Sequence, residues 1–276
     1  MSSPPLVRFP AFRHHETARK EANNAMMALL VGAQVSAQFL ELSRGSSRQL
    51  SEIFPTIAHI KRLNLRPDDA QVILRGAEEH LGAMAVPQAL AIHEGFILDC
   101  LSLLGAPSVK AWEMHTVLAV KAGGSFDTEL MCRFHVLREM RNSLIHRGGL
   151  ADSWLVNAIT NLTPASEAEW QKLAGRSPLG IKVGDKITLR LGELVLALTT
   201  TQALGWAANR LLITAVPAAK WAEMIIDDHL EQTPGKLDPH ARMQTILGLQ
   251  RHLYSAVKVT KSELRAAAAY RGITLR

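Results

Sequence analysis

Residues 127–149, DTELMCRFHVLREMRNSLIHRGG, decide the fold class of this chain. Apolar residues recur in this stretch at the spacing of an α-helix, beginning at Asp127. Gly148 and Gly149 close it, and glycine is the least costly residue just beyond a helix C-terminus. About 20 residues that rise about 1.5 Å each give a length of roughly 30 Å. The stretch therefore predicts one long amphipathic helix with basic residues in its last turns.

The chain on both sides of this stretch follows the same helical period. Pro67 suits the first turn of a helix, Pro87 is expected to open another, and Thr260 with Glu263 forms a capping box for the last one. Besides a short helix around Trp154, the expected helices cover residues 16–43, 50–63, 66–81, 89–104, 108–121, 127–146, 164–173, 193–215, 218–230, 240–257 and 261–270.

Residues 181–191, IKVGDKITLRL, break the helical pattern. Apolar and polar residues alternate there on both sides of Gly184 and Asp185, a dipeptide suited to a tight turn. The stretch predicts a β-hairpin. The expected fold is therefore mainly α: a helical bundle with one small β-hairpin and flanking helices.

The chain is expected to have three parts. Residues 1–85 form an N-terminal helical segment, residues 86–230 a central helical domain, and residues 236–276 a basic C-terminal helical segment. Residues 231–239, EQTPGKLDP, have the proline and glycine content of a linker between the last two parts.

Composition excludes several classes of protein. The 276 residues are 47% hydrophobic and 20% charged, which gives enough apolar side chain for a packed core. Two cysteines, Cys100 and Cys132, make a disulfide framework or a zinc ribbon unlikely to be the basis of the fold. Residues 1–20 lack the apolar core of a secretory signal, and residues 194–209 are too short and too polar to span a bilayer. We expect a cytoplasmic protein with no membrane contact.

The net charge of +6 is concentrated at one end of the chain. Residues 236–276 carry eight lysines and arginines against two acids, whereas the rest of the chain is balanced. Such a block can bind a nucleic-acid backbone, or it can simply increase solubility. If residues 240–257 and 261–270 form part of a helix-turn-helix unit, the side chains facing the backbone are expected to be Lys258, Lys261, Arg265 and Arg271.

The end of the long helix carries the residues best suited to chemistry, and they are Arg138, Arg141, Asn142, His146 and Arg147. The helix macrodipole favours cations at this end, which accounts for part of the cluster. Arginine also grips phosphate oxygens with two nitrogens, and histidine exchanges a proton near neutral pH. An offset of five residues sets Arg141 and His146 about 140° apart, so the two side chains could flank a groove with a second copy of the helix opposite.

The run RNSLIH followed by RGG resembles the signature of the HEPN superfamily, α-helical domains of prokaryotic toxins, phage-defence proteins and RNA-guided ribonucleases. Arg141, Asn142 and His146 match the three positions of that signature. The helix expected over 89–104 is loosely similar to the first helix of such domains, with Glu94 as its acidic residue, and residues 181–215 look like their closing part. The resemblance covers residues 86–217.

The resemblance implies metal-independent cleavage of RNA, with no cofactor. His146 would act as general acid and base, Arg141 would stabilise the charge on phosphorus, and Asn142 would orient His146 or the phosphate. The resemblance also implies a homodimer whose two Arg141/His146 pairs face each other, a toxin or phage-defence role, and an antitoxin or defence-system partner. Many HEPN-like domains are inactive dimerisation or scaffold modules, and that alternative stays open.

No histidine or acid outside this cluster has the spacing of metal ligands. His93, His115 and His135 lie on three different expected helices and are interpreted as packing or surface residues. Asp227, Asp228 and His229, near the end of the helix over 218–230, are expected on a solvated face. No metal site is predicted.

Overall fold

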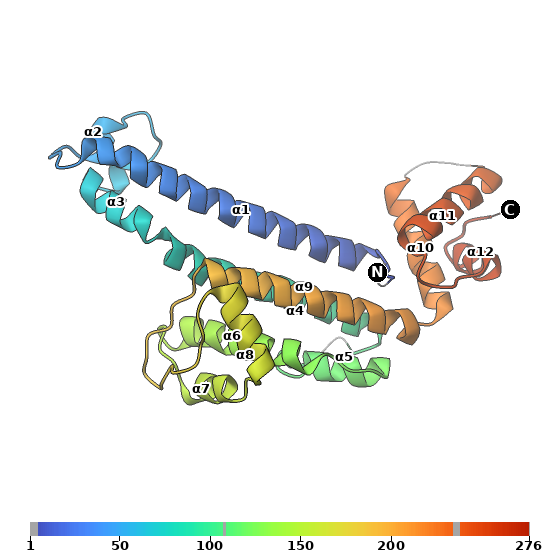
Figure 1. Ribbon diagram of the computed structural model, residues 1–276. Helices are drawn as coiled ribbons and strands as arrows, with labels where there is room; N and C mark the ends of the chain where they lie inside the picture. The colour runs from blue at the N-terminus through green and yellow to red at the C-terminus, as the bar shows by residue number, and fades with distance from the viewer. Residues whose placement is uncertain (1–4, 107–108, 234–237, 276) are drawn as a thin grey trace. The chain divides into compact units, whose positions relative to one another are not determined.

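A computed structural model describes residues 5–106, 109–233 and 238–275 (Figure 1). In these ranges the chain is mainly helical, and the predicted fold class is confirmed to that extent. The elements are α1 (Pro10–Leu40), η1 (Glu41–Ser43), α2 (Leu50–Ile53), η2 (Ile60–Arg62), α3 (Pro67–Arg75), α4 (Ala77–Leu103), α5 (Met114–Ala122), α6 (Thr128–His146), α7 (Ser153–Thr160), α8 (Pro164–Ala174), α9 (Leu191–Ala215), α10 (Ala218–Gln232), α11 (Pro239–Leu253) and α12 (Lys261–Tyr270), where η marks a short 3₁₀ helix.

The long helix predicted from residues 127–149 is confirmed as α6. At its start the Asp127 carboxylate accepts a hydrogen bond from the Leu130 N–H, 2.9 Å away. At its end Gly148 and Gly149 adopt φ angles of +63° and +83°, a conformation that costs glycine least. The capping box of Thr260 and Glu263 at the start of α12 is also confirmed.

Several predicted helix boundaries are wrong. The helix predicted over 66–81 ends at Arg75, and residues 77–81 belong to α4. Residues 50–63 contain α2 and η2 rather than one helix, because Pro55 has no N–H to continue the helical hydrogen bonds. Pro87 does not open a helix but lies inside α4. Val86 and Leu90, on either side of Pro87, are completely buried. Tertiary packing therefore keeps α4 helical across a residue that would otherwise end the helix. Ser108 and much of the predicted linker, residues 234–237, lie outside the described ranges.

The predicted hairpin over residues 181–191 is not formed, and within the described chain the segment makes only an isolated antiparallel bridge between Leu150 and Lys186. Its backbone hydrogen bonds go to the turn after α6: Ala151 N–H donates to Asp185 O over 2.8 Å, and Ile187 N–H donates to Gly149 O over 2.7 Å. The alternating pattern correctly indicates a buried side, since Ile187 is buried. The backbone of the segment, however, pairs with the turn after α6 rather than with the other half of the segment.

The chain divides into two compact units. Unit 1 comprises Met1–Arg19, Ala91–Met131 and Thr200–Arg276, and unit 2 comprises Lys20–Leu90 and Cys132–Thr199. The borders fall inside α1, α4, α6 and α9, so each unit is built from segments far apart in the sequence. The division into residues 1–85, 86–230 and 236–276 stays a prediction.

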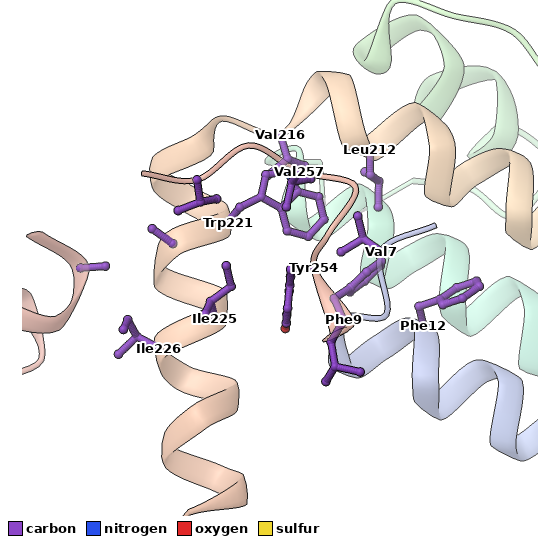
Figure 2. Close-up of a cluster of buried hydrophobic side chains, with 14 of the residues drawn as sticks. Val7, Phe9, Phe12, Leu212, Val216, Trp221, Ile225, Ile226, Tyr254 and Val257 are labelled. Atoms are coloured by element: carbon purple, nitrogen blue, oxygen red, sulfur yellow. The ribbon is translucent and has the colours of Figure 1, made fainter. Parts of the chain in front are cut away.

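Unit 1 has a core of aromatic and aliphatic side chains, in which α10 packs against α11 and α12 (Figure 2). The Tyr254 ring lies between Ile225 on α10 and Phe9 just before α1. Trp221 meets Phe9 edge to face, with ring centroids 5.7 Å apart, an arrangement that aromatic pairs prefer.

A buried carboxylate ties these elements together. Asp228, expected on a solvated face, has a fully buried side chain. Arg13 donates to both of its oxygens over 2.9 and 2.7 Å, the Tyr254 hydroxyl donates over 2.8 Å, and Gln232 donates over 2.7 Å. Burial favours the neutral acid, but these hydrogen bonds outweigh burial and hold the pKa of Asp228 below its usual value. His229 is buried as well, so the solvated interpretation of both residues is wrong.

The Asp228→Asn variant is expected to lower the free energy of unfolding by about 2–4 kcal/mol, because Arg13 would keep its charge and lose its counter-ion. Urea denaturation measures the loss. Asp227→Asn is the matched control: its carboxylate is half exposed and pairs with Arg271 at the surface, so the change should be much smaller. Equal losses in both variants would contradict the role given to Asp228.

In unit 2 the segment before α9 lies directly on α4. A Cβ atom on Gly82 would clash with the backbone carbonyl of Leu189, so only glycine permits this approach. The contact explains why residues 187–190 stay extended without pairing in a hairpin. A separate small core of Leu40, Leu50, Ile60 and Ala70 joins the end of α1 to α2, η2 and α3.

The Gly82→Ala variant is expected to destabilise the protein by about 1–3 kcal/mol, since backbone must move to make room. Gly95→Ala is a control in the same helix, where the added methyl meets no atom within 4 Å. That variant should stabilise the protein by up to about 1 kcal/mol through helix propensity alone. Thermal and urea unfolding of both variants tests the contact, and a neutral Gly82→Ala would refute it.

Two helices are long and apolar enough to cross a membrane by length and composition: the span Pro10–Ser43, which contains α1, and α4. In the most apolar 18 residues of each helix, 17% of the residues are buried in the first helix and 44% in the second. Core helices of water-soluble proteins meet the same criteria, so the expected absence of membrane contact stays a prediction.

Candidate functional site

The polar face of α6 carries the candidate site, and most of this helix belongs to unit 2. Phe134, Leu137, Met140 and Ser143 recur every three residues and form its buried face. The residues that resemble the HEPN signature fall on the remaining surface. Arg141 and Asn142 are partly buried, whereas His146 is exposed.

Four polar side chains between residues 138 and 142 of α6 are joined by hydrogen bonds. Arg138 donates to Glu139 Oε1 from Nε and Nη2, over 3.3 and 3.1 Å. The Asn142 amide donates to Glu139 Oε2 over 3.2 Å, and its carbonyl oxygen accepts from Arg141 Nε over 3.1 Å. The Asn142 amide therefore has a defined orientation, and it positions the guanidinium of Arg141.

Glu139 is a member of this network to which the sequence pattern assigned no role. Its side chain is only 18% exposed, and that of Arg138 is 12% exposed. The signal was available, because Glu139 lies three residues before Asn142 and so shares a helix face with it. Glu139 balances the charge of Arg138, while Asn142 links it to Arg141.

His146, the last residue of α6, is exposed, and in the part of the chain that the structure describes no hydrogen bond holds its imidazole. The last turn is completed by main chain: Ser143 O accepts from the N–H groups of Arg147 and Gly149, each over 3.0 Å. Arg147 makes a surface ion pair with Asp152 over 3.4 Å.

The remaining predicted residues lie elsewhere. Glu94 is half-buried on α4 in unit 1, whereas Arg141 and His146 belong to unit 2. Lys258, Lys261 and Arg265 are exposed in unit 1, and the last two are one turn apart on α12.

Arg271 differs from the other three basic residues that are expected to face a nucleic acid. Its guanidinium donates to both oxygens of Asp227 on α10, over 2.8 and 2.7 Å. This hydrogen bonding raises the pKa of Arg271. Arg271 therefore ties the end of α12 to α10, and its charge is balanced within the fold.

A buried histidine cluster lies in unit 1. His93 Nε2 and His115 Nε2 are 2.9 Å apart, so one ring donates a hydrogen bond and the other accepts it. His15 stacks on Phe96 with ring centroids 4.6 Å apart, and its ring lies 5.9 Å from that of His93. Across the described ranges no three His, Cys, Asp or Glu side chains are placed to hold a metal ion. The cluster packs the core, as predicted for His93 and His115, whereas His135 is half-buried in unit 2.

Burial lowers the pKa of His15 to about 4 and holds that of His93 well below its usual value. Both rings are therefore neutral in the folded protein at pH 5 to 7, while the unfolded chain takes up protons below about pH 6.5. Stability is fully present above pH 6.5 and declines as pH falls toward 4, by up to about 1.4 kcal/mol per pH unit for each such histidine.

Urea denaturation between pH 7 and pH 5 should show this slope. His15→Leu is expected to reduce the slope by the contribution of one proton, because the variant has no imidazole to protonate on unfolding. His14→Leu is the control, since His14 is exposed beside it. Identical slopes in both variants would show that His15 does not take up a proton on unfolding.

Comparison with known proteins finds no family model, no curated protein and no solved structure that matches the chain.

Proposed function

We propose that this protein is a metal-independent endoribonuclease of the HEPN type, with Arg141, Asn142 and His146 as its active-site residues. The observation that carries the proposal is the end of α6, where a hydrogen-bonded Arg141 and an exposed His146 occur within six residues. The HEPN resemblance further suggests a cytoplasmic toxin or phage-defence enzyme held in check by a partner protein.

The proposed reaction is transfer of the phosphodiester to the neighbouring 2′-hydroxyl of RNA. His146 removes the hydroxyl proton, the 2′ oxygen bonds to phosphorus, and the 5′ oxygen leaves with a proton from an acid. The products are a 2′,3′-cyclic phosphate and a 5′-hydroxyl end. Arg141 stabilises the extra negative charge on the phosphoryl oxygens. Asn142 orients the guanidinium group by accepting a hydrogen bond from Arg141 Nε.

The reaction needs both a base and an acid, whereas each chain supplies one His146. We therefore propose a composite site in which two copies face each other about a two-fold axis, each contributing Arg141 and His146. The acid that protonates the leaving oxygen is then the partner's His146.

The α6 main chain supports a chemical role over a capping role for these side chains. Ser143 O already has two N–H donors from the turn that follows, so it does not need a side-chain donor. The C-terminal macrodipole still favours the positive charges there, but it does not require an arginine held by an asparagine.

A second candidate function is binding of a nucleic acid through unit 1. The observation in its favour is the exposure of Lys258, Lys261 and Arg265, with Arg271 excluded by its pairing with Asp227. A protein of this kind binds duplex DNA or RNA with an affinity that falls as salt rises. An inactive scaffold built on the same fold is the remaining alternative.

Purified protein incubated with a mixed RNA pool in EDTA should produce fragments ending in 2′,3′-cyclic phosphate. Arg141→Ala and His146→Ala are each expected to reduce the rate by about 10²- to 10⁴-fold, because each removes a group that acts in the transition state. His80→Ala, at an exposed histidine of α4 in the same unit, is the control and should cleave at the wild-type rate. Circular dichroism verifies that each variant is folded.

Absence of cleavage by the wild-type protein, or equal cleavage by wild type and His146→Ala, would remove the catalytic role of this motif. Salt-dependent duplex binding that survives His146→Ala and is lost in Lys261→Ala/Arg265→Ala would then establish the second candidate. Loss of helical signal in Arg141→Ala or His146→Ala would indicate that these side chains stabilise the helix end.

A further inference from the structure

The second half of α1, in unit 2, has an apolar face that the described chain leaves uncovered. Residues 22–40 contain no charged side chain. Leu29, Val35 and Phe39 are 54%, 59% and 55% exposed, although α1 buries Leu30 and Leu40 on another side. Contiguous exposed apolar surface of this kind marks an interaction site on most proteins.

An apolar groove continues this surface. It has a volume of about 540 Å³ and lies between the end of α1 and the elements from α2 to α3. Its lining is apolar except for Ser36, and includes Phe54, Ile57 and Ile73. Val35 and Phe39 belong both to the exposed face and to the groove, so the two form one surface.

The spacing of residues along the exposed face is the same when it is read in either direction from Gly32. Ala25, Leu29, Gly32, Val35 and Phe39 follow one another at steps of three and four residues, the spacing of one helix face. Read backwards about Gly32, each large side chain meets a smaller one: Phe39 meets Ala25, and Leu29 meets Val35. A Cβ atom on Gly32 would meet no atom within 4 Å, so the backbone there is open to a second helix.

We propose that this face binds a second copy of the chain, with the two α1 helices antiparallel and the two-fold axis at Gly32. Such a contact is isologous, since each copy offers the same surface to the other. The absence of charge from residues 22–40 suits it, because neither copy then buries an unpaired charge.

Small residues favour a protein partner over lipid. Ala28, Gly32 and Ser36 lie one turn apart and allow two helices to approach closely, whereas lipid contact gains most from large side chains. A stable interface buries about 800 Å² on each partner. We include the adjoining groove in the interface, because it adds apolar surface to the exposed part of α1, which is about 27 Å long.

The inference does not depend on RNA cleavage. It concerns α1 and the groove, whereas the proposed active site lies at the end of α6. Arg141→Ala should therefore leave the α1 contact intact, and cross-linking at Gly32 tests that contact separately from RNA cleavage.

Sedimentation velocity of the full chain tests the association. The wild type should form a dimer at micromolar concentration, and Leu29→Glu and Val35→Glu should each weaken it at least about 100-fold, because a carboxylate would be buried without a partner. Val120→Glu is the control, at a valine of α5 in the other unit that is 75% exposed. Circular dichroism shows whether the variants keep their helices.

Disulfide cross-linking tests the geometry against the wild-type background of Cys100 and Cys132. Gly32→Cys should cross-link two copies, since the axis brings the two positions together. Ala25→Cys should not cross-link to itself, because antiparallel pairing separates its two copies by about 21 Å. Gln34→Cys points about 160° away from Gly32 and should stay reduced.

A monomer at high micromolar concentration would overturn the proposal, as would self-cross-linking of Ala25→Cys, which indicates parallel helices. A monomer that floats with phosphatidylcholine vesicles, and no longer does so as Val35→Glu, would assign the face to a membrane surface instead.

Discussion

The last turn of α6 needs partners for its carbonyl groups, and the main chain supplies two for the carbonyl oxygen of Ser143. Gly148 and Gly149, both with positive φ, turn the backbone so that two N–H groups reach Ser143 O. The same turn then binds residues 184–187 through Ala151 and Gly149. Because main-chain donors already bind Ser143 O, that carbonyl does not require a donor from Arg141, Asn142 or His146. The candidate active site depends on this arrangement.

Buried charges follow one rule in both units. In unit 1 the carboxylate of Asp228 is surrounded by donors, with Arg13 as the charged one. In unit 2 Glu193, almost fully buried, accepts from Arg176 over 2.7 Å, and the same guanidinium binds the carbonyl oxygen of Thr188 over 2.6 Å. Each pair joins segments distant in sequence, so the charges that must be neutralised also hold the chain in place. Beside the proposed site, Arg138 and Glu139 on α6 form another largely buried ion pair, in this case between neighbouring residues.

Both proposals involve a second copy of the chain, for different reasons. Each chain supplies a single His146 for a proposed reaction that needs a base and an acid, so that mechanism requires a facing copy. The face of α1 is apolar and self-complementary about Gly32, so a second copy would bury this surface away from water. The first contact is required by the proposed reaction, and the second removes apolar surface from water.

The sequence by itself determined the helices whose ends carry their own signals: α6 with Asp127 and two glycines, and α12 with its capping box. It also marked the run from Arg138 to Arg147 as the place for chemistry. Tertiary structure decided the rest. An alternating segment such as 181–191 has a buried side, but its pattern cannot say which backbone pairs with it, and packing on Gly82 and the turn after α6 made that choice. Asp228 likewise looks like a surface acid until Arg13, 215 residues away, reaches it, because local patterns do not encode long-range partners.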